Sequence, residues 1–178
     1  GVKVVLTRTA DTALSLDARA AAASGADLFV SIHANAAAST KAHGIETYYL
    51  DVTHDRYAKR LAHRENNGAE MDELEFILAD LATKVSARES KALARSVQKR
   101  LVRAARRVNS SARDLGVKSA MFHVLLGARC PSILVETAFV SNPREAEMLR
   151  RADYQNAIAD ALADGVMAHL SAPMVAAR

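Results

Sequence analysis

The stretch Asp27-Leu28-Phe29-Val30-Ser31-Ile32 decides the fold class, because it is a short, largely apolar run that stops at the polar segment His33-Ala34-Asn35. A second run of this kind, Ser132-Ile133-Leu134-Val135, stops at Glu136. Apolar runs of this length without alternation are typical of strands that are buried on both faces of a sheet. We therefore expect two core strands, each followed by a polar side chain.

The segments around these two strands alternate between strand-like and helix-like patterns. Leu14–Ser24 is Ala-rich and is followed by Gly25, which predicts a helix and its stop. A last helix is expected after Asn142 as N-cap, with Pro143 at its first position. Three further strands are expected at Val2–Thr7, Gly44–Leu50 and Phe122–Leu125. This alternation predicts an α/β fold with an open, twisted, mostly parallel sheet and helices on both faces.

A long helical segment interrupts this pattern. Between about residues 52 and 113 there is no strand signal, and charged residues are frequent. Apolar residues recur there at spacings of three and four, which predicts one buried helical stripe; they are Met71, Leu74, Leu78, Leu81 and Val85. We interpret the chain as one domain, 1–178, with a helical insertion at about 52–113.

Composition excludes several classes of protein. Half of the 178 residues are hydrophobic, a quarter are charged, and there are only 7 glycines and 3 prolines, which excludes a disordered, collagen-like or low-complexity chain. The apolar stretches are too short to cross a bilayer, so we expect no membrane span. The single cysteine, Cys130, cannot form a disulfide within the chain.

The net charge of +4 suits an anionic partner, such as nucleic acid, acidic lipid or an acidic wall polymer. Aromatic residues make up only 4% and Trp is absent, so base-stacking platforms are not expected and we predict no nucleic-acid partner. The basic run from Lys99 to Arg107 is expected to be a solvated helix face. Its alternative role is retention on an anionic wall polymer, which salt would weaken.

Polar side chains follow three of the predicted strands, where active sites of open α/β sheets gather. They are Arg8 and Asp11, then His33 and Asn35, then Glu136. From the residues alone, His33 is either structural or a metal ligand. Glu136 is either a salt-bridge or capping partner, or a general acid/base whose pKa is tuned by an apolar setting and a nearby cation.

Five ordered motifs resemble the zinc-dependent N-acetylmuramoyl-L-alanine amidases of bacterial cell-wall metabolism. The resemblance covers nearly the whole chain apart from the helical insertion and the tail. The motifs are Val4–Asp11, Leu16–Ala20, Ala26–Asn35, Gly44–Leu50 and Val135–Pro143.

The resemblance implies roles for individual residues. It makes His33 a ligand of a Zn²⁺ cofactor and Glu136 the catalytic carboxylate. Asn35 and Arg8 are, from the residues alone, expected either to orient loops or to contact substrate. The substrate would be peptidoglycan, cut at the amide between N-acetylmuramic acid and the L-alanine of the stem peptide. The resemblance also implies a periplasmic or extracytoplasmic location.

Two elements of the family pattern are absent from these 178 residues. The family takes its first zinc His from a Gly-His-Gly-Gly loop, and a Glu ligand follows before the strand that begins here at Val2. We therefore expect a domain that is incomplete at its N-terminus. The alternative is a non-catalytic peptidoglycan- or partner-binding domain with a degenerate zinc site.

The insertion resembles a regulatory segment found in some of these amidases. There, a helical insertion occludes the zinc cleft until an activator protein displaces it, and Ala62–Ala87 is the matching stretch. The resemblance implies autoinhibition, with Glu65 or Glu70 as the carboxylate that reaches the metal. The alternative is that these acids belong to a solvated helix face.

Overall fold

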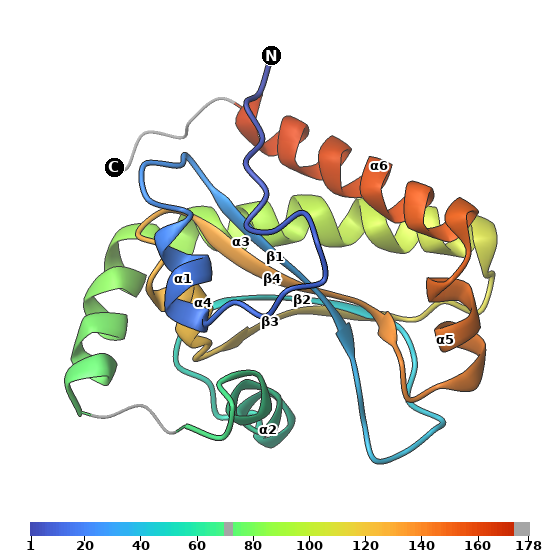
Figure 1. Cartoon of the computed structure of the whole chain (residues 1–178), viewed down its shortest axis with the longest axis horizontal. Coiled ribbons are helices and arrows are strands. Elements are labelled where there is room, and N and C mark those ends of the chain that lie inside the picture. The colour runs from blue at the N-terminus through green and yellow to red at the C-terminus, as the bar shows by residue number, and fades with distance from the viewer. Residues whose placement is uncertain (70–72, 173–178) are drawn as a thin grey trace. The chain divides into compact units, whose positions relative to one another are not determined.

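A computed structural model describes residues 1–69 and 73–172 of the chain (Figure 1). Four strands form one mixed sheet in the order β1-β4-β2-β3. The strands are β1 (Phe29–Asn35), β2 (Ile45–Leu50), β3 (Asp114–Ala120) and β4 (Ser132–Phe139). The helices are α1 (Leu16–Ala21), α2 (Arg56–Glu65), α3 (Glu73–Val108), α4 (His123–Leu126), α5 (Pro143–Leu149) and α6 (Ala152–Leu170). The α/β class expected from the sequence is confirmed.

The chain divides into two compact units, and every strand contributes residues to both. Unit 1 comprises Gly1–Ser31, Tyr49–Ser90 and Ser119–Ile133. Unit 2 comprises Ile32–Tyr48, Lys91–Lys118 and Leu134–Arg178.

β4 is buried at every position, as its apolar run predicts. In the sheet order it lies between β1 and β2, so its hydrogen-bonding edges are both occupied. Glu136 lies within this strand rather than after it, and its side chain is fully buried. The expectation that a polar residue closes the strand was therefore wrong by three residues, because the ladder continues to Phe139.

In unit 2, the second half of α3 packs closely against α6. Leu93, Val97 and Leu101 of α3 are fully buried. Gly165 of α6 lies so close that a Cβ there would be 2.8 Å from the Cα of Val97. The Ser96 hydroxyl donates a hydrogen bond of 2.8 Å to the Gly165 carbonyl oxygen. The stripe from Met71 to Val85 falls on residues or side chains outside the described part of the chain.

The start of α5 is the one predicted from sequence. The Asn142 side chain caps the helix by accepting from the backbone N–H groups of Arg144 and Glu145, and Pro143 is its first residue. Glu145 is buried and accepts from the N–H groups of Gly44 at 3.0 Å and Phe139 at 2.7 Å. One carboxylate thus joins α5 to the beginning of β2 and the end of β4. The predicted single last helix is in fact α5 followed by α6.

The predicted first strand, Val2–Thr7, is wrong. These residues have no regular secondary structure, and Val4, Val5 and Leu6 are 64–76% exposed. β-branched residues favour a strand only where a neighbouring strand completes the hydrogen-bonded ladder. Among the described residues, no strand pairs with this segment. The helix that follows, α1, covers only Leu16–Ala21 and is shorter than the predicted range Leu14–Ser24.

The predicted strand at Phe122–Leu125 is also wrong, because His123–Leu126 form the single turn of α4 and Phe122 is its N-cap. The N–H groups of Leu125 and Leu126 both donate to the Phe122 carbonyl oxygen. Phe122 itself makes no capping side-chain bond. The side chain of Asn66 supplies the cap, since its Oδ1 accepts from the His123 N–H at 3.0 Å. Within the described residues, no helix is both long and apolar enough to cross a membrane.

Candidate metal centre

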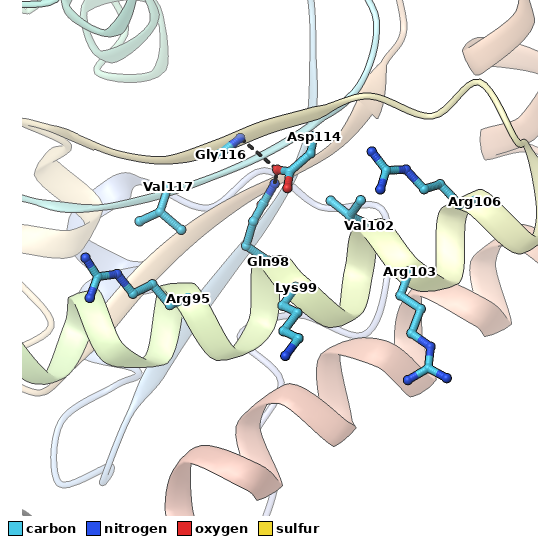
Figure 2. Close-up of a pocket in the computed structure, with 9 residues that line it drawn as sticks. All are labelled: Arg95, Gln98, Lys99, Val102, Arg103, Arg106, Asp114, Gly116 and Val117. Carbon is cyan, nitrogen blue, oxygen red and sulfur yellow. Dashed lines mark hydrogen bonds between the residues drawn. The ribbon is translucent and has the colours of Figure 1, made fainter.

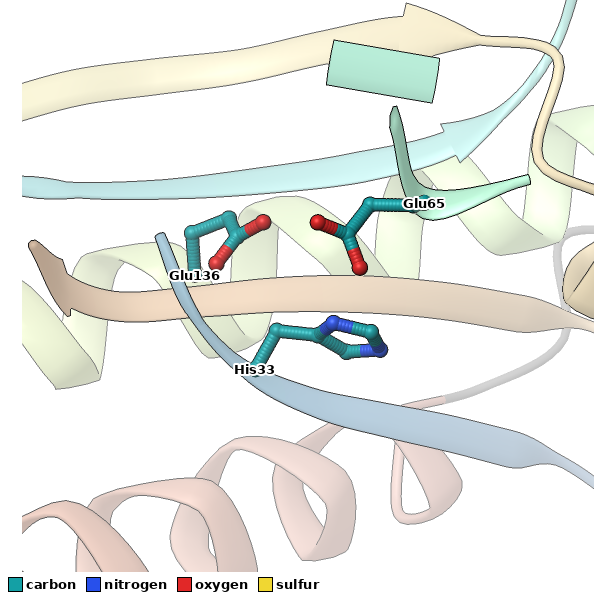
Figure 3. Close-up of side chains that lie close together, drawn as sticks. All are labelled: His33, Glu65 and Glu136. Atoms are coloured by element: carbon teal, nitrogen blue, oxygen red, sulfur yellow. The ribbon is translucent and has the colours of Figure 1, made fainter. Parts of the chain in front are cut away.

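The structure brings together two of the residues singled out in the sequence, His33 and Glu136. They come from neighbouring strands of the sheet, β1 and β4, and both belong to unit 2. Each offers one potential ligand atom, and these two atoms lie within 4.8 Å of one another. Figure 3 shows the side chains of His33 and Glu136.

Hydrogen bonds fix the backbone that carries this pair. The Thr137 hydroxyl donates to the His33 carbonyl oxygen at 2.9 Å, which locks the two strands at the level of the site. The Tyr154 hydroxyl of α6 donates to the Thr137 carbonyl oxygen at 2.7 Å. Burial is the main cause that raises the pKa of Tyr154, so its hydroxyl stays protonated as a donor. The part of β4 beside Glu136 is therefore held by both β1 and α6.

The donor set fits a zinc ion. Imidazole nitrogen and carboxylate oxygen are both ligand types that zinc accepts, and a catalytic zinc site keeps one position open. His33 is half-buried and Glu136 fully buried, so an ion held by His33 would be shielded on the side of the sheet. A carboxylate this close to an imidazole is also suited to accept a proton beside a bound ion.

A buried polar network that the sequence did not predict lies on the same face of the sheet. Asn35 follows His33 by two residues, so the two side chains point to one face of β1. Its Nδ2 donates to Oε1 of Glu46 at 2.7 Å, and Lys118 Nζ donates to Oε2 of Glu46 at 2.6 Å. Lys118 Nζ also lies 5.9 Å from the ring centroid of Tyr48. Asn35 is thus joined by its side chain to the buried carboxylate of β2.

The sequence held a signal for Glu46. It stands in an alternating strand, where a carboxylate among Ile, Thr and Tyr needs a partner if it is buried. Glu46 is fully buried, and Lys118 is the cation that compensates it. Lys118 lies 72 residues away in the chain, which is why the pattern around Glu46 could not identify its partner.

The other residues singled out in the sequence include Arg8, Asp11 and Glu70. Arg8 is exposed in unit 1, where its Nη1 donates to the Thr12 carbonyl oxygen at 2.8 Å. Asp11 is exposed in the same irregular segment. Glu70 lies outside the described residues. Because the predicted first strand is absent, Arg8 and Asp11 are not presented by a strand end.

Glu65 is the last residue of α2, and its surroundings in unit 1 are well defined. The next residue, Asn66, is buried and joins α2 to the segment before α4. Its Nδ2 donates to the Met121 carbonyl oxygen at 2.9 Å, in addition to the cap on His123. Asn67 and Gly68 then adopt positive φ angles of 57° and 78°, which ends the helix in a tight turn. The position of Glu65 on its own unit is therefore fixed by Asn66.

Comparison with known proteins places this arrangement in a family. The family described as N-acetylmuramoyl-L-alanine amidase matches residues 1–168. The amidase LytC of Bacillus subtilis is 36% identical over 171 residues, covering 95% of this chain and 27% of LytC. The amidase AmiA of Escherichia coli is 33% identical over 182 residues, covering 95% of this chain and 61% of AmiA.

A crystal structure shares the fold. The N-acetylmuramoyl-L-alanine amidase from Clostridium difficile 630 matches with a TM-score of 0.70 and 31% sequence identity, over 96% of this chain and 73% of that one. The chain spans between about a quarter and three fifths of the length of the two curated relatives. Since the family match extends over nearly the whole chain and includes both strands of the site, the chain belongs to the N-acetylmuramoyl-L-alanine amidase family.

Proposed function

We propose that this chain is the catalytic domain of a zinc-dependent peptidoglycan amidase. The bond cleaved is the amide between N-acetylmuramic acid and the L-alanine of the stem peptide. The observation that carries the proposal is the pairing of His33 with Glu136 in a member of this family. The domain is taken as 1–178, with its helical insertion at about 52–113, and the protein acts in the periplasm or another extracytoplasmic space.

In this proposal His33 holds the metal and Glu136 moves the proton. A zinc ion bound at His33 would supply Lewis-acid chemistry to the scissile carbonyl group. The Glu136 carboxylate accepts a proton from the attacking water as the new C–O bond forms. It then delivers this proton to the leaving nitrogen as the C–N bond breaks. The step yields the lactyl carboxylic acid and the amine of L-alanine; the acid then loses its proton to the amine, so the final products are a carboxylate and an ammonium group, and atoms and charges balance.

The setting of Glu136 suits this role. Its side chain is fully buried, and the strand that carries it is held on both edges. A carboxylate in a low-dielectric site interacts more strongly with developing charge than one in water. The bond from Thr137 to the His33 carbonyl keeps the two side chains at a constant separation, which proton transfer requires.

Hydrolysis by the full-length protein tests the proposal. Purified peptidoglycan is digested, and new N-terminal alanine is quantified by amino-group labelling. Glu136→Gln keeps the shape but cannot accept the proton, and we expect a loss of about 100-fold or more in rate. Glu147→Gln, an exposed acid on α5, is the matched control and should retain full activity. Undiminished release by Glu136→Gln would refute the assignment and favour the non-catalytic binding domain.

Autoinhibition by the insertion is part of the proposal. We assign the blocking carboxylate to Glu65, because it lies in the stretch that resembles the regulatory segment and Asn66 anchors it within its own unit. A protein activator would bind the segment 62–87 and withdraw this carboxylate. Glu65→Gln is then expected to raise basal hydrolysis, whereas the exposed Glu89→Gln should not. Equal basal rates in both variants would argue against Glu65 as the blocking group.

A further inference from the structure

We propose that a groove between the second half of α3 and strand β3 is a second binding site, which takes a zwitterionic peptide bearing carboxylates and a free amino group. The identity of this ligand as the stem peptide of peptidoglycan rests on the proposed function. The groove has a volume of about 610 Å³ and lies wholly within unit 2 (Figure 2). It shares no lining residue with the candidate metal centre.

The helix side of the groove is strongly cationic. Arg95, Lys99 and Arg103 follow one another at intervals of four residues, and Arg106 continues the series. The first three are exposed, and within the described residues they make no hydrogen bond or ion pair. Like charges at this spacing destabilise a helix. An anionic ligand would remove this repulsion, and arginine forks match carboxylates in a bidentate way.

The strand side of the groove adds a single negative charge. Oδ1 of Asp114 accepts from Gln98 Nε2 at 2.6 Å and from the Gly116 N–H at 2.9 Å. Both bonds go to the same oxygen, so within the described residues Oδ2 accepts no hydrogen bond, and Asp114 lines the groove (Figure 2). A carboxylate among cations repels a dense polyanion, whereas it attracts the ammonium group of a ligand that also carries carboxylates.

Two other occupants fit the groove less well. The first is an added β-strand, because β3 is the last strand in the sheet order. However, the Gly116 N–H already donates to Asp114, and the Lys118 side chain donates to the buried Glu46. Such features protect a strand edge from pairing with an added strand. No aromatic side chain is among the nine lining residues, so single-stranded nucleic acid would find no surface for stacking. The charged side chains of the groove would therefore recognise the ligand.

Peptide binding to the full-length protein tests this inference. All measurements use the Glu136→Gln background, so that binding is independent of hydrolysis. The probe is the pentapeptide N-acetyl-L-Ala-γ-D-Glu-L-Lys-D-Ala-D-Ala, compared by titration calorimetry with the same peptide acetylated also on its side-chain amine, so that only the first peptide carries a free amino group. Arg95→Gln combined with Arg103→Gln is expected to weaken binding of both peptides about fivefold. Arg144→Gln combined with Arg150→Gln removes the same charge elsewhere and should have no effect.

Asp114→Asn decides between a zwitterion and a polyanion. It keeps the acceptor at Oδ1 and removes the charge, so it should weaken binding of the free-amine peptide but not of the doubly acetylated one. A polyanion such as poly(glycerol phosphate) would instead bind more tightly to Asp114→Asn, and tighter binding of that polymer than of the peptide would overturn the proposal. Unchanged peptide affinity in the Arg95/Arg103 variant would also overturn it. Peptide binding at the groove without any hydrolysis by the native protein would refute the proposed function alone.

Discussion

Asn35 and Glu46 are joined by a side-chain hydrogen bond of 2.7 Å, although β4 lies between their strands β1 and β2. The bond therefore crosses the face of the sheet that carries Glu136. Since Lys118 of β3 holds the other oxygen of Glu46, the polar network extends from the first to the last strand in the sheet order. This network ties β1, the strand that carries His33, to β2 and β3.

Removing Asn35 should destabilise the protein. Asn35→Ala removes a buried hydrogen bond to Oε1 of the fully buried Glu46, and the loss of one partner of such a bond costs about 1–3 kcal/mol. Urea unfolding followed by circular dichroism measures this loss. Asn109→Ala changes a side-chain amide just after α3 that, in the part of the chain the structure describes, bonds only to Ser111, and it should cost much less. An equal loss in the two variants would contradict the role given to the network.

Gly165→Ala should also destabilise, against the usual preference of helices for alanine. In an exposed helix this change stabilises by about 1 kcal/mol. Here the new Cβ would lie 2.8 Å from both Cα and Cγ2 of Val97, so α3 and α6 must separate. We expect a net loss of about 1–3 kcal/mol. Adding Val97→Ala removes Cγ2 but not Cα, so rescue in the double variant should be partial; a stabilised single variant would contradict the close contact.

The metal assignment predicts a change in thermal stability. A ligand present at 100 times its dissociation constant stabilises the folded state by about 2.7 kcal/mol. The full-length protein should therefore melt at a higher temperature with zinc than after treatment with a chelator. His33→Ala should lose much of this difference, while His54→Ala, an exposed histidine before α2, should keep it. A difference of the same size in both variants would remove His33 from the ligand set.

Local sequence patterns were sufficient where the interactions that decide the structure are local. The cap of α5 at Asn142 was predicted because its acceptor and donors lie within three residues. The apolar run before Glu136 predicted a buried strand for the same reason. The pairing of His33 with Glu136 followed from two strands ending in polar residues and from the family resemblance, and the structure brings the two side chains together.

The failures share a different physical cause, which is dependence on partners distant in sequence. Val2–Thr7 has strand propensity but no neighbouring strand among the described residues. Phe122–Leu125 forms a helical turn because Asn66, 57 residues before His123, caps it. Lys118 could not be assigned to Glu46 without knowing that β2 and β3 are neighbours. In each case the pattern described the segment correctly but carried no information about its partner.

Glu145 gives a prediction about pH. Its pKa is raised above the ordinary value of 4.5 mainly by burial, although the N–H groups of Phe139 and Gly44 and the nearby His43 act in the opposite direction. The folded state therefore favours the protonated carboxyl group. Its contribution to stability is fully present below pH 4.5 and is lost as the pH rises through the higher folded-state pKa.

The matched variant for this test is Glu145→Gln, which has the same shape and does not titrate. The free energy of unfolding of each protein is measured in urea between pH 4 and pH 7. The value for the native protein minus that for the variant should fall as the pH rises, because only the native protein must then bury a charge. A difference that rises with pH would show that the two N–H donors outweigh burial, so that the folded-state pKa of Glu145 lies below its ordinary value.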